Sequence, residues 1–440
     1  MTTTSQETTS HETAPRADST SAAAPPHLAI VLFSLAMGGF AIGTTEFASM
    51  SLLPFFAADL RIDEPTAGHA ISAYALGVVL GAPLIAVLGA RFARRTQLLA
   101  LMAVFAIGNA LTALAPGFGW MMAARFLSGL PHGAYFGIAA LVAASLVPQQ
   151  RRSQVIGQVM LGLTIATIVG VPLANWIGQA VGWRASFGLV SVLALLTVLL
   201  CALFAPRDQA GRSDPLRELG ALKSGRVWIT LAIGAIGFGG MFAVYTYLAT
   251  TLIEVTKVST AVIPLFLAVF GVGATLGNLF VPRFADRALM PTAGVILLFA
   301  AVALLVFPLA AHNPWLLAAD VFAIGASVSL GAILQTRLMD VAGDAQALAA
   351  ALNHSAFNTA NALGPFLGGL AIREGLGWTS TGPVGAALAL LGFLIWIVAW
   401  RDAQPAAPPL ASSGGATALK NAPTPPDRRS RTESAREPVA

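Results

Sequence analysis

Charged side chains are scarce in this chain of 440 residues. Asp, Glu, Lys and Arg together make up only 10% of it, whereas a soluble globular domain carries about 25%. Hydrophobic residues make up 56%, and the mean hydropathy is +0.75. A chain with so little charge cannot cover a water-exposed surface. The composition therefore excludes an ordinary soluble protein and predicts an all-α polytopic membrane protein.

Cysteine is almost absent as well. Cys201 is the single cysteine, which excludes an internal disulfide and a cysteine-based metal site. The sequence also lacks a GxxxxGK[ST] phosphate loop, a zinc motif and a GxSxG nucleophile elbow. We therefore expect no metal, no cofactor, no direct use of ATP and no enzyme activity. The net charge of +5 comes from basic residues in loops and tails, so we expect no nucleic-acid partner.

Long apolar runs are what the chain does contain. About twelve of them reach the roughly twenty residues needed to cross a bilayer. They predict a disordered N-terminal tail at 1–27, a six-helix bundle at 28–204, a linker at 205–226, a second six-helix bundle at 227–401 and a disordered C-terminal tail at 402–440. The predicted spans are Leu28–Phe56, Ala67–Leu88, Gln97–Ala115, Trp120–Leu146, Gln154–Trp176, Ser186–Phe204, Val227–Ile253, Thr260–Val281, Thr292–Leu309, Trp315–Met339, Gln346–Ile372 and Pro383–Trp400.

The placement of Lys and Arg predicts the orientation of these spans. If both termini are cytoplasmic, the cytoplasmic loops hold 13 basic residues. The outer loops then hold only 4, namely Arg61, Arg184, Lys257 and Arg373. Because positive charge gathers on the cytoplasmic side, we expect both termini there.

The two halves of the chain repeat each other. Four pairs of short segments match at an offset of about 195 residues. The pairs are Trp120–Arg125 with Trp315–Asp320, Gly182-Trp183 with Gly377-Trp378, Gly170 and Pro172 with Gly364 and Pro365, and Ala90-Arg91 with Asp286-Arg287. A two-fold repeat of six helices is typical of a secondary transporter whose site lies between the halves near the bilayer midplane.

Three charged residues lie well inside predicted spans: Glu46, Arg125 and Asp320. A charged side chain at the bilayer centre costs about 2.5–3.5 kcal/mol, so such residues are functional candidates. Glu46 and Arg125 lie at similar depths, which predicts that they meet if their helices are neighbours. We assign proton coupling to these three residues together with His132, which follows Pro131 in a predicted break of the fourth span. A static buried ion pair and a packed core histidine remain open as alternatives.

Polar and aromatic residues inside the spans are candidates for a substrate cavity. The eleventh span has Asn353, Asn358 and Asn361. Their spacing places several of the polar residues of this span on one helical face. Such a face either lines a cavity or makes hydrogen bonds between helices. Aromatic side chains are equally able to serve packing. The cavity candidates are Phe47, Tyr74, Tyr135, Phe238, Tyr245, Asn353, Asn358 and Asn361.

Several short motifs carry a resemblance to a known family. They are Gly43-Thr-Thr-Glu-Phe47 with Leu52-Leu-Pro54, Leu130-Pro-His-Gly133, Gly170-Val-Pro-Leu173 and Gly182-Trp-Arg184. Over residues 28–401 the chain resembles the drug:proton antiporter branch of the major facilitator superfamily, in particular arabinose-efflux-like and chloramphenicol-resistance-like exporters. The resemblance implies the major facilitator fold, with two pseudo-symmetric six-helix bundles.

The resemblance also implies roles for particular residues. Arg125 matches an arginine implicated in proton coupling, and Gly170 and Pro172 match an antiporter motif that shapes the interface between the halves. A cytoplasmic latch is implied for Arg91, Arg94, Arg95, Asp286 and Arg287. Ala90 stands where the family has an acidic residue in the first-half loop, so a carboxylate latch is in doubt there.

These observations predict a monomeric exporter in a bacterial inner membrane, driven by the proton gradient. Its substrates would be small apolar or amphipathic molecules, chloramphenicol-like compounds among them, and its other partners protons and the lipid bilayer. A sugar or nucleoside exporter of the same fold is the first alternative, because the eleventh span is polar. A membrane sensor or scaffold that transports nothing is the second, although it leaves the repeat unexplained.

Overall fold

A computed structural model describes residues 27–89, 92–148, 151–207, 223–342 and 346–403. Every regular element in these ranges is helical, which confirms the all-α prediction. The predicted tails and most of the linker lie outside these ranges, so the predicted domain boundaries stay predictions. The described helices up to Arg401 belong to one folded unit.

The first half of the chain forms its spans from helices that are often interrupted. The elements are α1 (Leu28–Ser51), α2 (Leu53–Leu60), α3 (Glu64–Ala67), α4 (His69–Gly89), α5 (Arg94–Ala113), α6 (Phe118–Gly129), α7 (His132–Ser145), α8 (Arg152–Ile165), a π-helical turn (Ala166–Gly170), α9 (Val171–Ala180) and α10 (Trp183–Phe204). Pro131 lies between α6 and α7, where the fourth span was predicted to break. Its ring removes a backbone donor, so the helical ladder is interrupted there.

The second half follows the same plan. Its elements are α12 (Gly225–Gly237), α13 (Gly239–Thr246), α14 (Leu248–Glu254), a 3₁₀ turn (Thr260–Val262), α15 (Ile263–Phe280), α16 (Pro282–Ala285), α17 (Leu289–Ala310), α18 (Pro314–Ala326), a 3₁₀ turn (Ser327–Ser329), α19 (Leu330–Val341), α20 (Gln346–Ala371), a π-helical turn (Ile372–Leu376), a 3₁₀ turn (Trp378–Ser380) and α21 (Thr381–Ala403).

Within the described residues, 11 helical segments are long and apolar enough to cross a membrane. The remaining predicted span coincides with α20, whose apolar sequence is interrupted by Asn353, His354, Asn358 and Asn361. Its 26 residues rise about 39 Å at 1.5 Å per residue, which exceeds the hydrocarbon thickness. The fold therefore agrees with a chain of about twelve spans.

The surface and interior of the bundle are inverted relative to a soluble protein. Large apolar side chains are exposed along many spans, Leu309 at 77% and Trp315 at 83% among them. Polar side chains such as Thr45, Asn109 and Arg125 are instead almost fully buried. An apolar exterior matches the solvent provided by lipid tails.

Equivalent positions of the two halves adopt the same local structure. Gly182 and Gly377 both have positive φ, at 117° and 80°, each before the tryptophan that follows it. Gly170 packs so closely on α1 that an added Cβ would lie 2.2 Å from Thr44 Oγ1. Gly364 packs in the same way on α13, with Gly239 O at 2.3 Å. The offset found in the sequence therefore corresponds to repeated helix packing.

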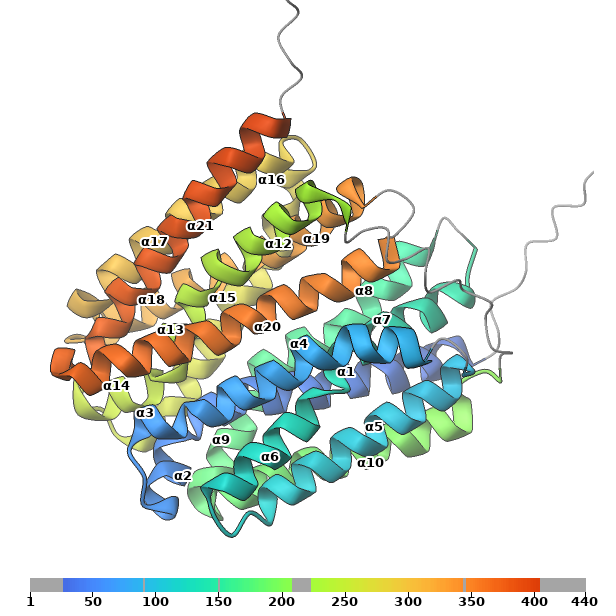
Figure 1. The fold of residues 1–440 in the computed structure, drawn as a ribbon. Coiled ribbons are helices and arrows are strands. Elements are labelled where there is room, and N and C mark those ends of the chain that lie inside the picture. The colour runs from blue at the N-terminus through green and yellow to red at the C-terminus, as the bar shows by residue number, and fades with distance from the viewer. Residues whose placement is uncertain (1–26, 90–91, 149–150, 208–222, 343–345, 404–440) are drawn as a thin grey trace, which may run out of the picture. The chain divides into compact units, whose positions relative to one another are not determined.

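The halves meet along a few helix pairs, of which α4 with α20 is the most extensive (Figure 1). On α4, the Ser72 hydroxyl donates to Ala362 O of α20 at 3.0 Å. A second pair consists of the π-helical turn and α9 against α15. There Gly271 allows close approach, because an added Cβ would lie 2.5 Å from Thr167 O.

Candidate functional site

Arg125 is the centre of a buried polar network in the first half. Its side chain is 0% exposed on α6. The guanidinium donates to Thr45 Oγ1 and to Ser49 Oγ of α1, each at 3.2 Å. It also lies over the rings of Tyr74 and Phe187, with 4.3 and 5.4 Å to the ring centroids. Two hydrogen bonds and two aromatic faces hold the charge in a fixed orientation.

The partners of Arg125 are themselves oriented by hydrogen bonds. Thr45 donates its hydroxyl to Asn109 Oδ1 at 2.7 Å, and Asn109 donates to Phe105 O at 2.9 Å. Ser49 donates to the backbone oxygen of Glu46 at 2.9 Å. Each hydroxyl donates its hydrogen to another acceptor, so a lone pair of its oxygen is available to accept a hydrogen bond from Arg125. Thr45, Ser49 and Asn109 had not been selected from the sequence as site residues.

Glu46 lies beside this network but turns toward the other half. The carboxyl group is 7% exposed, and its Oε1 accepts a hydrogen bond from Asn361 Nδ2 of α20 at 3.2 Å. Glu46 and Arg125 make no ion pair within 4.0 Å. Thr45 and Ser49 are four residues apart and share a helical face, whereas Glu46 is rotated away from it. The sequence placed the two charges at one depth but could not give this rotation.

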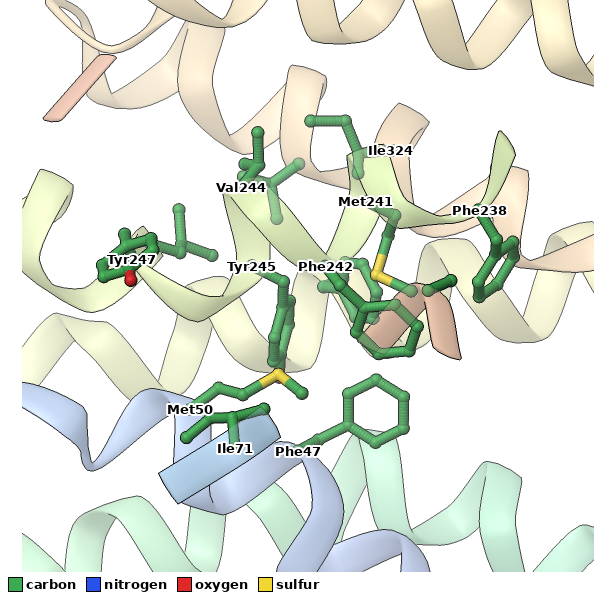
Figure 2. Packing of buried hydrophobic residues seen from close by; sticks show 14 of the residues in the cluster. Phe47, Met50, Ile71, Phe238, Met241, Phe242, Val244, Tyr245, Tyr247 and Ile324 are labelled. Carbon is green, nitrogen blue, oxygen red and sulfur yellow. The ribbon is translucent and has the colours of Figure 1, made fainter. Parts of the chain in front are cut away.

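Next to Glu46, an aromatic cluster joins the two halves. Phe47 stacks on Phe242 with ring centroids 6.3 Å apart, and it meets Tyr245 edge-on at 5.5 Å. Figure 2 shows these rings facing one another from α1 and α13, with Met50 beside Tyr245. Phe47 and Phe242 are equivalent positions of the repeat, separated by the same offset of 195 as Trp120 and Trp315. Their contact indicates that the pseudo-two-fold axis passes beside Glu46.

Two histidines continue the buried network toward the second half. His132 Nδ1 lies 2.9 Å from the hydroxyl of Tyr74, the residue whose ring Arg125 covers. The ring of His132 lies 5.9 Å from that of His354 on α20, and His354 stacks on Phe136 at 5.3 Å. His354 was not selected from the sequence. Its place between Asn353 and Asn358 was the available signal, because it lies one helical turn before Asn358.

The three asparagines of α20 are all buried, but their surroundings and hydrogen bonds differ. Asn361 is 0% exposed and Asn358 2%. Asn358 donates through Nδ2 to His354 O at 3.0 Å. The side-chain oxygens of both Asn358 and Asn361 are buried without a hydrogen-bond partner among the described residues. Asn353 is 6% exposed on another side of the same helix.

The other predicted cavity residues divide into two groups. Phe238 belongs to the aromatic cluster, at 5.6 Å from Phe242 and 4.6 Å from Phe357. Tyr135 instead donates its hydroxyl to Leu35 O of α1 at 2.7 Å. An added Cβ on Gly38 would lie only 2.1 Å from the Tyr135 hydroxyl oxygen. Tyr135 therefore serves a tight contact inside the first half, and the structure does not bring it to Glu46.

Asp320 occupies the position in α18 that Arg125 occupies in α6. It is 7% exposed, and its Oδ2 has no hydrogen-bond partner among the described residues. Asp320 makes no ion pair or hydrogen bond with the Glu46 and Arg125 network in the described structure. The repeat thus places a buried charge of opposite sign in each half, away from each other.

The predicted latch residues lie at the ends of spans. Arg91 is outside the described residues. Arg95 donates to the backbone oxygen of Ala202 on α10, and Arg94 lies at the start of α5. Asp286 and Arg287 are exposed after α16. Asp286 lines a pocket of about 310 Å³ together with Thr336 and Asp340.

The predicted antiporter motif coincides with an irregular turn. Gly170 ends the π-helical turn, and Pro172 lies in the first turn of α9. This turn packs on α1 within the first half and on α15 of the second half. Gly170 and Pro172 therefore lie where the two halves touch.

Among the described residues, two carboxyl groups outside the membrane spans have a lowered pKa. The backbone hydrogen bond from Thr66 lowers the pKa of Asp63. Asp59, near the end of α2, accepts hydrogen bonds from the Arg184 guanidinium and from Trp183 Nε1. The Arg184 hydrogen bond lowers the pKa of the Asp59 carboxyl below its ordinary value. In the described ranges, no group of three or more His, Cys, Asp or Glu residues is arranged to hold a metal ion.

Comparison with known proteins gives a consistent result. Residues 35–344 match the Major Facilitator Superfamily. The chain is 38% identical over 372 residues to the inner membrane transport protein YdhP of Escherichia coli K12, covering 84% of this chain and 96% of that protein. It is 32% identical over 375 residues to a chloramphenicol resistance protein of Streptomyces lividans, covering 83% and 94%. A probable sugar efflux transporter of Helicobacter pylori is 29% identical over 372 residues, with 83% and 94% covered.

Among solved structures, the fold is similar to a bacterial homologue of the human lysosomal transporter Spinster in an inward-facing, occupied conformation. The TM-score is 0.67 at 18% sequence identity, covering 86% of this chain and 97% of that one. This likeness concerns the fold, and it agrees with the helical repeat described above.

Proposed function

Because the chain belongs to the Major Facilitator Superfamily, a family of membrane transporters and not of enzymes, we propose that it is a proton-coupled exporter of small amphipathic molecules. The named relatives include both a drug resistance protein and a sugar efflux protein. The protein is thus a multi-pass membrane transporter, and proton coupling, export and substrate class are the proposed parts. We further propose a monomer in a bacterial inner membrane with both termini cytoplasmic.

One observation carries the proposal of proton coupling. Glu46 is a buried residue whose carboxyl group, among the described residues, accepts its side-chain hydrogen bond from Asn361 of the opposite half. When Glu46 is ionised, this is a charge-assisted hydrogen bond, about twice as strong as a neutral one. Protonation of Glu46 removes the charge and weakens the contact between α1 and α20. A proton on Glu46 therefore favours separation of the halves at this point, which is the change that alternating access requires.

Arg125 has a supporting role in this scheme. Its hydrogen bonds to Thr45 and Ser49 fix the face of α1 that flanks Glu46. Because Arg125 does not pair directly with Glu46, the proton does not have to break a buried ion pair. The guanidinium provides a fixed positive charge within the same half, and the carboxylate is free to change its partner.

We assign the proton route to Tyr74, His132 and His354, whose rings are neighbours across the contact between the halves. The Tyr74 hydroxyl and His132 Nδ1 are within hydrogen-bond distance, and the two imidazoles come from opposite halves. Neutral imidazole both donates and accepts, so it can pass a proton along a chain of hydrogen bonds. Separation of the halves would interrupt this route between His132 and His354.

The test is transport by purified protein in proteoliposomes with an imposed pH gradient. Wild type and Glu46→Gln would be compared with radiolabelled chloramphenicol and with a panel of labelled sugars, and lumenal pH would be followed with a trapped dye. We expect gradient-driven transport and proton movement in the wild type, and loss of both in Glu46→Gln. The matched control is Glu254→Gln, because Glu254 is an exposed carboxylate paired with Lys257. Unchanged gradient-driven transport in Glu46→Gln would disprove the assignment.

A sugar exporter is the second candidate function. The buried polar face of α20, with Asn358 and Asn361, favours it. The same liposomes separate the two candidates by which labelled compounds the gradient drives.

A further inference from the structure

Two amide groups at the contact between the halves have unused acceptors. Asn358 donates to His354 O and Asn361 donates to Glu46 Oε1. The Oδ1 atom of each has no hydrogen-bond partner among the described residues, although the side chains are 2% and 0% exposed. A buried polar atom without a partner has lost its hydrogen bond to water and gained none in return, so it destabilises the fold. Two such atoms three residues apart on one helix point to a ligand that supplies donors.

The helix geometry shows which way these oxygens face. His354, Asn358 and Asn361 share one side of α20, because they are spaced four and three residues apart. His354 contacts His132 of the first half, and Asn361 contacts Glu46. Asn358 lies between them and therefore faces the first half as well.

The surroundings indicate the rest of the ligand. Phe357, next to Asn358, packs on Phe238, which continues to Phe242 and Phe47. An apolar aromatic wall thus adjoins the acceptor pair. Glu46 reaches this contact, and Arg125 lies within the first half on the adjoining residues Thr45 and Ser49 of the same helix. The two charges have opposite signs, so the ligand need not bring a counter-charge. Such a site fits a neutral molecule with an apolar body and several hydrogen-bond donors.

We propose that Asn358 and Asn361 form an acceptor subsite for the hydroxyl or amide N–H groups of a neutral amphipathic substrate. This inference rests on the proposed function, because it names the class of molecule that the transporter carries. It also places the substrate beside Glu46. Asn361 would then accept from the substrate through Oδ1 while it donates to Glu46 through Nδ2, so one amide group links binding to the contact between the halves.

The experiment is equilibrium binding to the full chain in lipid nanodiscs, without a proton gradient. The probes are matched pairs in which the hydroxyl donors are present or capped: chloramphenicol with its 1,3-di-O-acetyl derivative, and 4-nitrophenyl β-glucoside with its per-O-methylated derivative. Tetraphenylphosphonium serves as a cation without donors. The variants are Asn358→Leu and the control Thr359→Val, because Thr359 is an exposed residue of the same helix whose hydroxyl bonds to Ser355 O.

We expect at least one uncapped probe to bind about tenfold more tightly than its capped partner. Asn358→Leu should lower the affinity of that probe about 3- to 10-fold and leave the capped partner unchanged. Thr359→Val should change neither. The comparison of capped and uncapped probes in the wild type needs no variant, so it decides the question even if Asn358→Leu does not fold.

Three results would overturn the subsite. They are equal binding of capped and uncapped probes, binding of tetraphenylphosphonium alone, and no binding of either uncapped probe. Because binding is measured without a gradient, these results do not depend on proton coupling. Loss of coupling would appear only in the liposome assay with Glu46→Gln, so the two proposals fail separately.

Discussion

Replacing Arg125 by lysine tests the buried network most directly. Lysine keeps the positive charge but presents one compact ammonium group instead of a planar fork. It can replace the hydrogen bond to Thr45 or that to Ser49, but not both, and it loses the flat contact with Tyr74. A hydrogen bond to a charged group contributes about 1.5–3 kcal/mol, and a desolvated cation–π contact about 2 kcal/mol. We therefore expect Arg125→Lys to destabilise the protein by about 2–4 kcal/mol.

The single cysteine provides the assay. Cys201 is 1% exposed on α10, so a fluorogenic thiol reagent reacts with it only as the bundle unfolds. The temperature of half-maximal labelling in detergent micelles then reports stability. Arg184→Lys is the matched control, because Arg184 also covers an aromatic ring, that of Trp183, but at an exposed site. Its loss should be about 1 kcal/mol or less. Equal shifts for the two variants would refute the argument that the buried fork holds α6 to α1.

Two further predictions concern close packing and an exposed ion pair. Gly271→Ala places a methyl group against Thr167 O between the halves, so we expect slower transport in liposomes with little change in unfolding temperature. Gly273→Ala meets Phe322 O inside the second half, so we expect a loss of about 1–3 kcal/mol by Cys labelling; the reverse pattern would contradict both. Asp59→Asn should cost at most about 1 kcal/mol at neutral pH. Because the folded pKa of Asp59 is lowered, this stabilisation is present above the unfolded pKa of about 3.9 and disappears as the pH falls through the folded pKa. A difference that does not shrink as the pH falls below the unfolded pKa would contradict the ion-pair origin.

The glycine-rich stretch Gly271–Gly277 shows which helix contacts the local sequence predicts and which it does not. Small residues four apart predict a close helix contact, and Gly273 and Gly277 lie against Phe322 O and Ala326 O of α18. The sequence could not show that Gly271, two residues earlier, belongs to a different contact with the other half. Adjacent turns of one helix contact different neighbouring helices, and which helix each turn contacts depends on how the whole bundle is assembled.

The sequence by itself determined the membrane class, the approximate spans, the break at Pro131 and the two-fold repeat. These properties follow from local composition and spacing, because a lipid solvent demands apolar helices of a fixed length. It also singled out Glu46 and Arg125 as candidate functional residues, because a charged residue within a long apolar run can be recognised without knowing the fold.

Only the tertiary structure decided which groups meet. In the folded protein, the Glu46 carboxyl group accepts a hydrogen bond from Asn361, and Arg125 donates to Thr45 and Ser49. The ring of His354 lies beside that of His132 of the other half. It also assigned Tyr135 to a contact within one half. These pairings depend on how each helix is rotated about its axis and which helix lies beside it. A shift of one residue turns a side chain by about 100°, and depth in the membrane carries no information about that angle.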